Sequence, residues 1–246
     1  MKESSSNRAS HVNSGTSVSV KNYHSSESRI RHPKLLVEVE RNDSSPFGGL
    51  SLATALVRSI GLGRAVDRAV KILKERRPYS ESDHVLTQVY NLYIGGSSIE
   101  DISYLQCSES ARRILGARRL PDPTTAGDFL RRFNEGSLRA LDRVIDDAHE
   151  QVWRRAYGRK KKACAYVDLD SHVHAIYGEQ KEGADYTYKG SYGYHPFVIS
   201  LAQTQEVLRL HNRYGNVASA DGVAAELERV MPLLTRNFKT VIVRGD

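Results

Sequence analysis

The sequence has few cysteines and no long apolar run, and both absences narrow what the chain can be. It contains only two cysteines, Cys107 and Cys164, which give neither a disulfide framework nor a CxxC motif of the kind that binds metal. The best apolar stretch, residues 52–66, is interrupted by Arg58 and Arg64 and cannot span a membrane. The N-terminus lacks the apolar segment of a secretory signal. We therefore expect a cytoplasmic, reducing location and no membrane partner.

The composition is that of a globular protein with an excess of positive charge. Apolar residues make up 39% and charged residues 26% of the 246 positions, enough apolar content for a core. Lysine and arginine total 36 against 29 acidic residues, a formal charge of +7. A basic surface favours a polyanionic partner, of which nucleic acid is the commonest, so we also expect association with the nucleoid.

Three regions follow one another along the chain. Residues 1–45 are rich in serine and poor in large apolar side chains, which predicts a disordered tail. Residues 46–158 carry apolar side chains at helical spacing between turn residues, without period-two alternation, and predict an all-helical domain. From residue 159 onward the pattern becomes that of an α/β domain. The fold class predicted is therefore α followed by α/β.

Specific helix positions follow from the spacing. Leu52, Leu56 and Ile60 form a predicted buried stripe that ends before Gly61. Thr124 or Thr125 is expected to cap a later helix, and Ser137 to open the longest one.

Strand positions are predicted by short apolar runs in the last third. Residues 163–169, 197–202 and 207–211 are expected strands, and the loop 203–206 joins the last two as a hairpin. A helix over 219–234 and a strand over 240–244 follow.

Two of these strands deliver carboxylates at their ends. Asp168 and Asp170 are two residues apart, so both side chains point to the same face of their strand. Asp246 follows the last strand after Gly245. Carboxylates beside a buried sheet favour a hard divalent cation such as Mg²⁺, although the first pair also suits a helix or turn cap.

A glycine- and tyrosine-rich segment, residues 178–196, interleaves aromatic and cationic side chains. Tyr188, Lys189, Tyr192 and His195 suit contact with DNA through stacking and charge. The alternative is a mobile loop whose tyrosines cover the sheet.

Basic runs offer further candidate contacts to phosphate. The first is Arg159, Lys160 and Lys161, which equally suits a solvated linker. Within the helical region, arginine pairs at 112–113, 118–119 and 131–132 are the best candidates for a DNA-binding face.

Taken in order, the motifs resemble the DDE-type transposases of bacterial insertion sequences. The strings are DLDS at 168–171, QKEGADY at 180–186, YKG at 188–190, GYHP at 193–196, NRYGN at 212–216 and VRGD at 243–246. The resemblance is most specific from Tyr166 to Asp246, and the helical region resembles the family's N-terminal DNA-binding part more loosely.

The resemblance implies a ribonuclease H-like core in which two aspartates and a glutamate hold two divalent ions, Mg²⁺ or Mn²⁺. It implies Asp170 as the first catalytic, metal-holding aspartate, with Asp168 as a neighbouring candidate ligand, and Asp246 as the second. In the family the glutamate lies further downstream, so the sequence predicts an incomplete core and a C-terminally truncated, inactive form.

The function implied is DNA cleavage and strand transfer at the terminal repeats of an insertion sequence. The expected partners are double-stranded DNA of the terminal repeats and target, with a homodimer or pairing with full-length transposase. The alternative is a non-catalytic DNA-binding fragment that inhibits or modulates intact transposase. A third reading, a helical scaffold joined to an unrelated α/β module, would bind no DNA.

Overall fold

The structure, a computed structural model, describes residues 46–178 and 180–245. The predicted disordered tail over residues 1–45 lies outside this range. The chain divides into two compact units. Among the described residues, one unit comprises 46–59 and Asp83–Asp128, and the other comprises Ile60–Ser82 and those from Phe129 onward.

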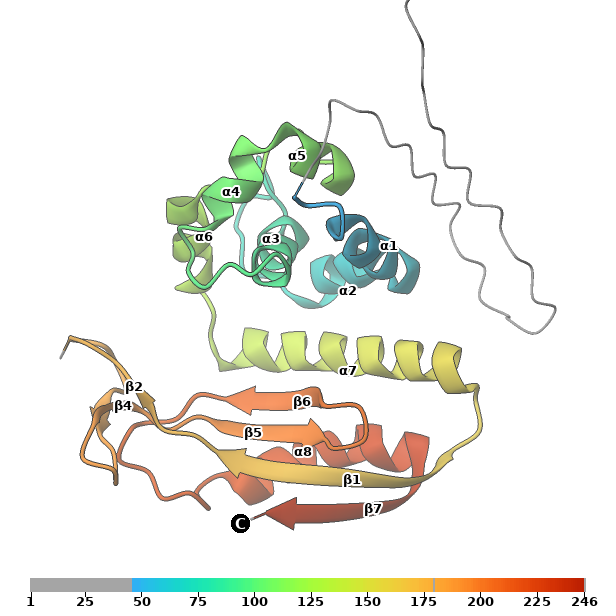
Figure 1. Cartoon of the computed structure of the whole chain (residues 1–246), viewed down its shortest axis with the longest axis vertical. Helices are drawn as coiled ribbons and strands as arrows, with labels where there is room; N and C mark the ends of the chain where they lie inside the picture. Colours follow the sequence, from blue (N-terminus) through green and yellow to red (C-terminus); the bar gives the residue numbers. More distant parts are fainter. Residues whose placement is uncertain (1–45, 179, 246) are drawn as a thin grey trace, which may run out of the picture. The chain divides into compact units, whose positions relative to one another are not determined.

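The first unit is helical. Its helices are α1 (Leu50–Ile60), α3 (Glu81–Tyr93), α4 (Ile102–Cys107), α5 (Glu109–Leu115) and α6 (Pro123–Leu130), of which a few terminal residues fall in the second unit (Figure 1). The cap of α6 is neither of the predicted threonines. Asp122 accepts a hydrogen bond from the Thr125 amide, and Pro123 occupies the first helical position, where its missing N–H costs nothing.

Helix α1 lies where the sequence predicts it, but its buried side differs. Leu52 and Leu56 are 60% and 51% exposed, whereas Leu50, Thr54 and Val57 are buried. The predicted stripe was therefore wrong for its two leucines. Apolar residues occupy more than one face of this helix, so spacing alone fits two orientations.

The second unit is built on a four-stranded mixed sheet. The strand order is β6 (Glu206–His211), β5 (Phe197–Leu201), β1 (Lys162–Ser171) and β7 (Phe238–Gly245). Strand β1 is antiparallel to β5 and parallel to β7, and β5 and β6 form the predicted hairpin (Figure 1). All four predicted strands are confirmed at their positions.

Three helices belong to the same unit as the sheet. They are α2 (Leu62–Ala69), α7 (Glu135–Tyr157) and α8 (Val223–Asn237). The longest helix, α7, starts earlier than predicted because Asn134 is its cap. The Asn134 side chain accepts from the Ser137 amide, and the Ser137 hydroxyl accepts from the Asn134 amide, which forms a capping box.

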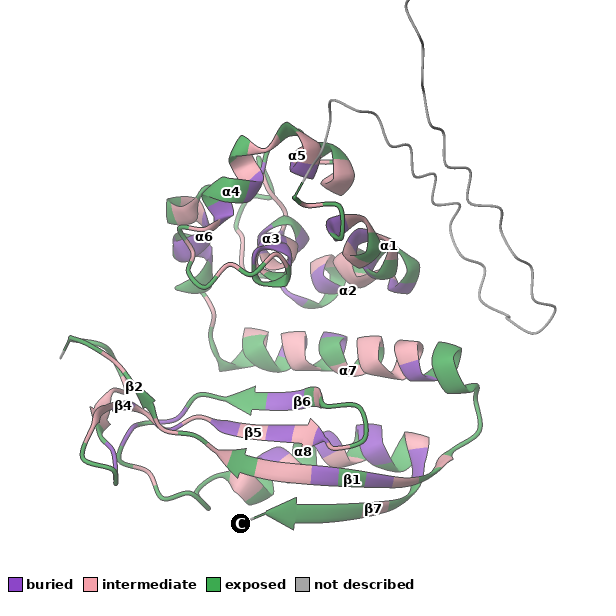
Figure 2. Cartoon of the chain, in the orientation of Figure 1, coloured by how far each residue is buried: buried purple, intermediate pink, exposed green. Residues whose placement is uncertain are grey.

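One core joins the sheet to α7 and α8. It contains Trp153 of α7 and three residues of α8, Val230, Leu233 and Leu234. The strands contribute Ala165, Val167, Phe197, Ile199, Leu201, Leu208 and Phe238. Side chains alternate across a strand, so Ala165 and Val167 face this core while Asp168 and Asp170 face away from it. Beyond Phe238, β7 is largely exposed (Figure 2).

A second, smaller sheet lies at the end of β1 and was not predicted. Its order is β2 (His174–Ala175), β4 (Tyr192–Tyr194) and β3 (Asp185–Tyr186), all antiparallel. These strands have two or three residues, too short for a period-two pattern to reveal them.

The change from helix to strand falls where the sequence places it, because α7 ends at Tyr157 and β1 begins at Lys162. The compact units divide the chain differently, since α2 and α7 belong with the sheet, and the domain assignment itself stays a prediction. No helix in the described ranges is long and apolar enough to cross a membrane.

Candidate active site

The two carboxylates of β1 lie on one exposed face of the sheet but differ in their partners. Asp168 is paired through two contacts with Arg244 of the neighbouring strand β7, Nε to Oδ1 at 2.7 Å and Nη2 to Oδ2 at 2.9 Å. These hydrogen bonds, and then the charge of Arg244, lower the pKa of Asp168 below its usual value. Asp168 is therefore held ionised and neutralised by a fixed cation.

Asp170 is exposed, and its carboxylate makes no hydrogen bond or ion pair with any described residue. It stands opposite Val198 of β5 at the end of the strand. A carboxylate left without a cation at a strand end offers oxygen ligands of the kind that Mg²⁺ and Mn²⁺ take. The donor chemistry at this position fits a hard divalent ion, with Asp170 as the available ligand and Asp168 already committed.

The third predicted carboxylate, Asp246, lies outside the described residues. The strand that leads to it, β7, runs parallel to β1 and pairs Gly245 with Leu169. Within the described ranges no group of three or more histidine, cysteine or acidic side chains is arranged to hold a metal.

Glu226 belongs elsewhere in the unit. It is buried on α8, where its carboxylate meets Nδ1 of His211 at 3.0 Å and Nη1 of Arg229 at 2.5 Å. Because α8 packs on the core side of the sheet, Glu226 is separated from Asp170 by the sheet itself.

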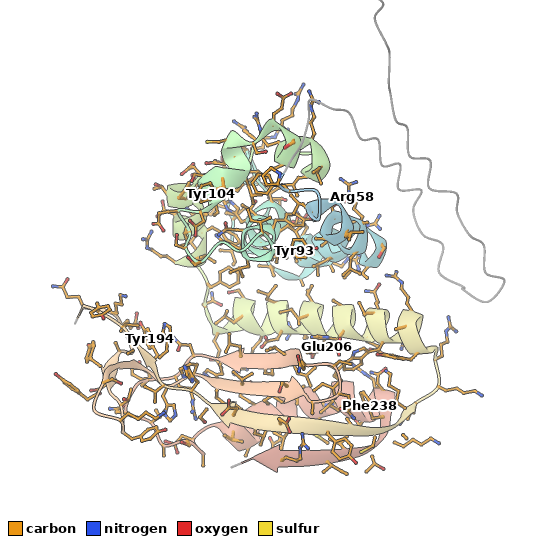
Figure 3. All side chains as sticks on the ribbon, viewed as in Figure 1. Arg58, Tyr93, Tyr104, Tyr194, Glu206 and Phe238 are labelled. Atoms are coloured by element: carbon orange, nitrogen blue, oxygen red, sulfur yellow. The ribbon has the colours of Figure 1, made fainter. Side chains whose placement is uncertain are left out.

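The predicted DNA contacts are placed unevenly. Tyr188 and Lys189 are exposed next to each other, with Lys189 Nζ 5.6 Å from the centre of the Tyr188 ring. Tyr192 is half-buried in β4 and packs edge-on against Tyr186. Tyr194, which Figure 3 labels, also belongs to β4 and donates from its hydroxyl to the Glu182 carbonyl.

His195 is fully buried, and this placement does not fit a direct DNA contact. Its Nδ1 lies 3.0 Å from the Val217 carbonyl oxygen, and its ring packs against Tyr188 at 5.4 Å. The sequence could not show this, because a histidine between tyrosine and proline suits a surface loop and an interior turn equally.

The basic run between α7 and β1 is exposed. Arg159, Lys160 and Lys161 all reach solvent, and Lys161 donates from Nζ to the Thr235 carbonyl at the end of α8.

Two arginines that were not predicted as site residues make hydrogen bonds near the end of β1. Arg244 neutralises Asp168, and Arg213 is buried at the end of β1 with five hydrogen bonds. Their positions in the sequence could have pointed to them, because Arg244 directly precedes Gly245 and Arg213 lies inside the motif at 212–216. That motif is also tied to the one at 180–186, because Asn216 Nδ2 donates to Asp185 Oδ2 at 2.6 Å.

A comparison with protein families assigns the chain to one of them. The family described as transposase DDE domain, group 1, matches residues 27–246. The chain belongs to this family of DDE transposases. Members of the family bind DNA, transfer phosphoryl groups in DNA and generally use divalent metal ions. No curated protein and no solved structure matches the chain.

Proposed function

We propose that this DDE transposase cleaves DNA at the terminal repeats of an insertion sequence and transfers the strand to target DNA. Asp170 is the first metal-holding carboxylate, and Asp246 is assigned as the second from the sequence. The observation that carries the proposal is that the carboxylate of Asp170, at the exposed end of β1, has no partner among the residues that the structure describes. Asp170 lies beside the parallel strand β7, which leads toward position 246.

Bound divalent ions would supply activation of water or of a DNA 3′-hydroxyl and neutralisation of charge on the leaving oxygen. The chain's residues would do the rest. Asp170 provides oxygen ligands, while Arg244 keeps Asp168 neutralised and holds β7 against β1. Exposed Tyr188 and Lys189 would contact the DNA near the cut by stacking and charge.

We also propose that the second unit forms the first part of a ribonuclease H-like core. In its support, β6, β5 and β1 are successive antiparallel neighbours, and β7 adds to β1 in parallel after helix α8. The helical first unit is proposed as the DNA-recognition part.

A cleavage assay on supercoiled plasmid carrying terminal repeats tests the proposal. We expect Mg²⁺- or Mn²⁺-dependent nicking that Asp170→Asn abolishes. Asp147→Asn is the matched control, because Asp147 is an exposed carboxylate of α7. Nicking that survives in Asp170→Asn would contradict the site. The sequence also predicts an inactive form, and a wild-type chain that nicks no plasmid would favour that prediction over the cleavage proposed here.

The second candidate is a protein that binds DNA without cutting it, either occupying terminal repeats or pairing with full-length transposase. An arginine cluster around the end of α5 favours it. Arg112, Arg113 and Arg118 line one shallow hollow with a single carboxylate, Glu109. Arg58 of α1 reaches the same turn and donates to the Leu115 carbonyl.

Salt dependence of DNA binding tests this candidate. Each arginine-phosphate contact adds about 0.9 to the slope of log affinity against log salt. We expect the double variant Arg112→Gln/Arg118→Gln to lose about two such contacts. Arg143→Gln, which removes an exposed charge on α7, should leave the slope unchanged. Binding with an unchanged slope in the double variant would exclude the cluster.

A further inference from the structure

Arg213 is a buried arginine whose guanidinium group is almost fully used. It is only 8% exposed. Its Nη2 donates to the hydroxyl of Ser171 at 3.3 Å. Its other hydrogen bonds go to main-chain carbonyl oxygens, from Nε to His195 at 2.9 Å and from Nη1 to Ala218, Ser219 and Asp221 at 3.3, 3.1 and 2.6 Å.

These partners explain how a cation is tolerated here. Burying a charge is costly unless hydrogen bonds replace its hydration, and carbonyl dipoles together with the Phe197 ring, 5.4 Å from the guanidinium carbon, supply that replacement. The planar guanidinium presents its donors in a rigid fork that a lysine ammonium cannot reproduce. The contacts of Arg213 therefore depend on shape as well as on charge.

The partners also come from three segments that meet at the end of β1. Ser171 is the last residue of β1, His195 directly precedes the turn into β5, and residues 218–221 lead into α8. The Ser171 hydroxyl is itself fixed on its other side, since it donates to the Ser219 carbonyl at 3.3 Å. Arg213 thus ties the side chain of Ser171, the residue that follows Asp170, to the main chain before β5 and before α8.

We propose that Arg213 is a positioning residue for the carboxylate of Asp170. It touches neither metal nor DNA. It acts through Ser171 and the loop before α8 to fix the direction in which the side chain of Asp170 projects from the strand. This inference rests on the proposed function, in which Asp170 holds a divalent ion. Residues that orient a metal ligand typically change metal affinity about 10- to 100-fold when they are altered.

Mn²⁺ binding to the full chain, followed by electron paramagnetic resonance of the free ion, tests the proposal. We expect Arg213→Lys to weaken Mn²⁺ binding about tenfold, and Ser171→Ala, which removes one contact of the fork, to weaken it by a smaller factor. The matched control is Arg209→Lys. Arg209 is also a buried arginine of this sheet and pairs twice with Asp146 of α7, so its variant loses a comparable fork away from Asp170.

The control separates positioning from general stability. Arg209→Lys and Arg213→Lys should both lower the melting temperature, but only Arg213→Lys should change Mn²⁺ affinity. Equal Mn²⁺ affinity in Arg213→Lys and wild type would overturn the proposal. If Arg213→Lys does not fold, Ser171→Ala decides, and unchanged affinity in that variant overturns it.

Asp170→Asn distinguishes this inference from the function beneath it. Loss of Mn²⁺ binding in Asp170→Asn with no effect of Arg213→Lys overturns the positioning role alone. Mn²⁺ binding that is absent in wild type, or unaffected by Asp170→Asn, overturns the proposed function and the positioning role together.

Discussion

Asp168 and Arg244 form a two-point ion pair across neighbouring parallel strands, at 2.7 and 2.9 Å. They are 76 residues apart in sequence and stand directly opposite each other in the register of β1 and β7. Both side chains are substantially exposed, so the pair contributes little to stability. Its main effect is on the charge of the site. Arg244 neutralises Asp168, which leaves Asp170 as the neighbouring carboxylate that is free to bind a cation.

Replacement of Arg244 by glutamine should strengthen divalent-ion binding. The change deletes a positive charge and releases Asp168 as a second oxygen ligand on the same face as Asp170. We expect Mn²⁺ affinity to rise about tenfold, as an added carboxylate and a lost cation both favour the ion. Titration calorimetry of the full chain measures it.

Arg236→Gln is the control for this change. Arg236 lies on α8 and pairs with Glu150 of α7, so the substitution removes the same charge away from Asp168 and Asp170. It should leave Mn²⁺ affinity unchanged. Weaker binding in Arg244→Gln would show instead that the ion pair supports the site.

The indole of Trp153 links α7 to the hairpin, and its loss should destabilise the second unit. Nε1 donates to both carboxylate oxygens of Glu206, at 3.1 and 2.9 Å. Trp153→Phe keeps an aromatic ring but leaves the partly buried Glu206 short of a donor, which costs about 1–3 kcal/mol. Because the chain has a single tryptophan, unfolding is followed by circular dichroism.

The exposed Tyr157 on the same helix provides the comparison. Tyr157→Phe keeps the ring that Lys162 Nζ approaches at 4.8 Å and should change stability by less than about 0.5 kcal/mol. If the two substitutions lower the free energy of unfolding equally, the Trp153–Glu206 hydrogen bonds do not stabilise the unit as proposed.

Local patterns were sufficient for the elements of the sheet and insufficient for their pairing. The apolar runs at 163–169 and 240–244 predicted β1 and β7, since a short apolar run bounded by turn residues indicates a strand whether or not it is buried. No local signal fixes the register that sets Asp168 opposite Arg244, because register depends on packing between distant segments. The carboxylates were therefore found from the sequence, but the partner of Asp168 was not.

Burial was the property least accessible from sequence. His195 suited a DNA contact by composition but is enclosed, and Leu52 and Leu56 suited a core but are exposed. In each case the residue type is compatible with both environments, and the packing of other segments decides between them.

Gly215 lies where no side chain fits, and alanine there should disturb the small sheet. A Cβ atom at this position would press into the carbonyl oxygens of Gly193 and Asp185, which are backbone atoms that cannot rotate away. We expect Gly215→Ala to cost about 1–3 kcal/mol, as overpacking does. Asn216→Ala, which removes only the hydrogen bond to Asp185, should cost about 1 kcal/mol. Chemical denaturation of both variants compares them, and a harmless Gly215→Ala would refute the close contact.

Asp142 of α7 should make the second unit less stable as the pH rises. Burial raises its pKa above the ordinary value of 3.8, and the nearby carboxylates of Glu226 and Asp146 add to the effect, while Arg209 and Arg229 oppose it. A raised pKa means that the folded state binds the proton more tightly than the unfolded state. Below 3.8 the side chain is protonated in both states and contributes nothing, whereas above its folded pKa the cost of ionising it is fully present.

Asp142→Asn mimics the protonated side chain and should remove this cost. The variant should match wild type at a pH below 3.8 and exceed it in free energy of unfolding at neutral pH. Urea titrations followed by Trp153 fluorescence measure the difference at each pH. Asp147→Asn, at an exposed position of the same helix, should show no such pH-dependent gain. A variant that is less stable than wild type at neutral pH would mean that attraction to Arg209 and Arg229 outweighs the burial of Asp142.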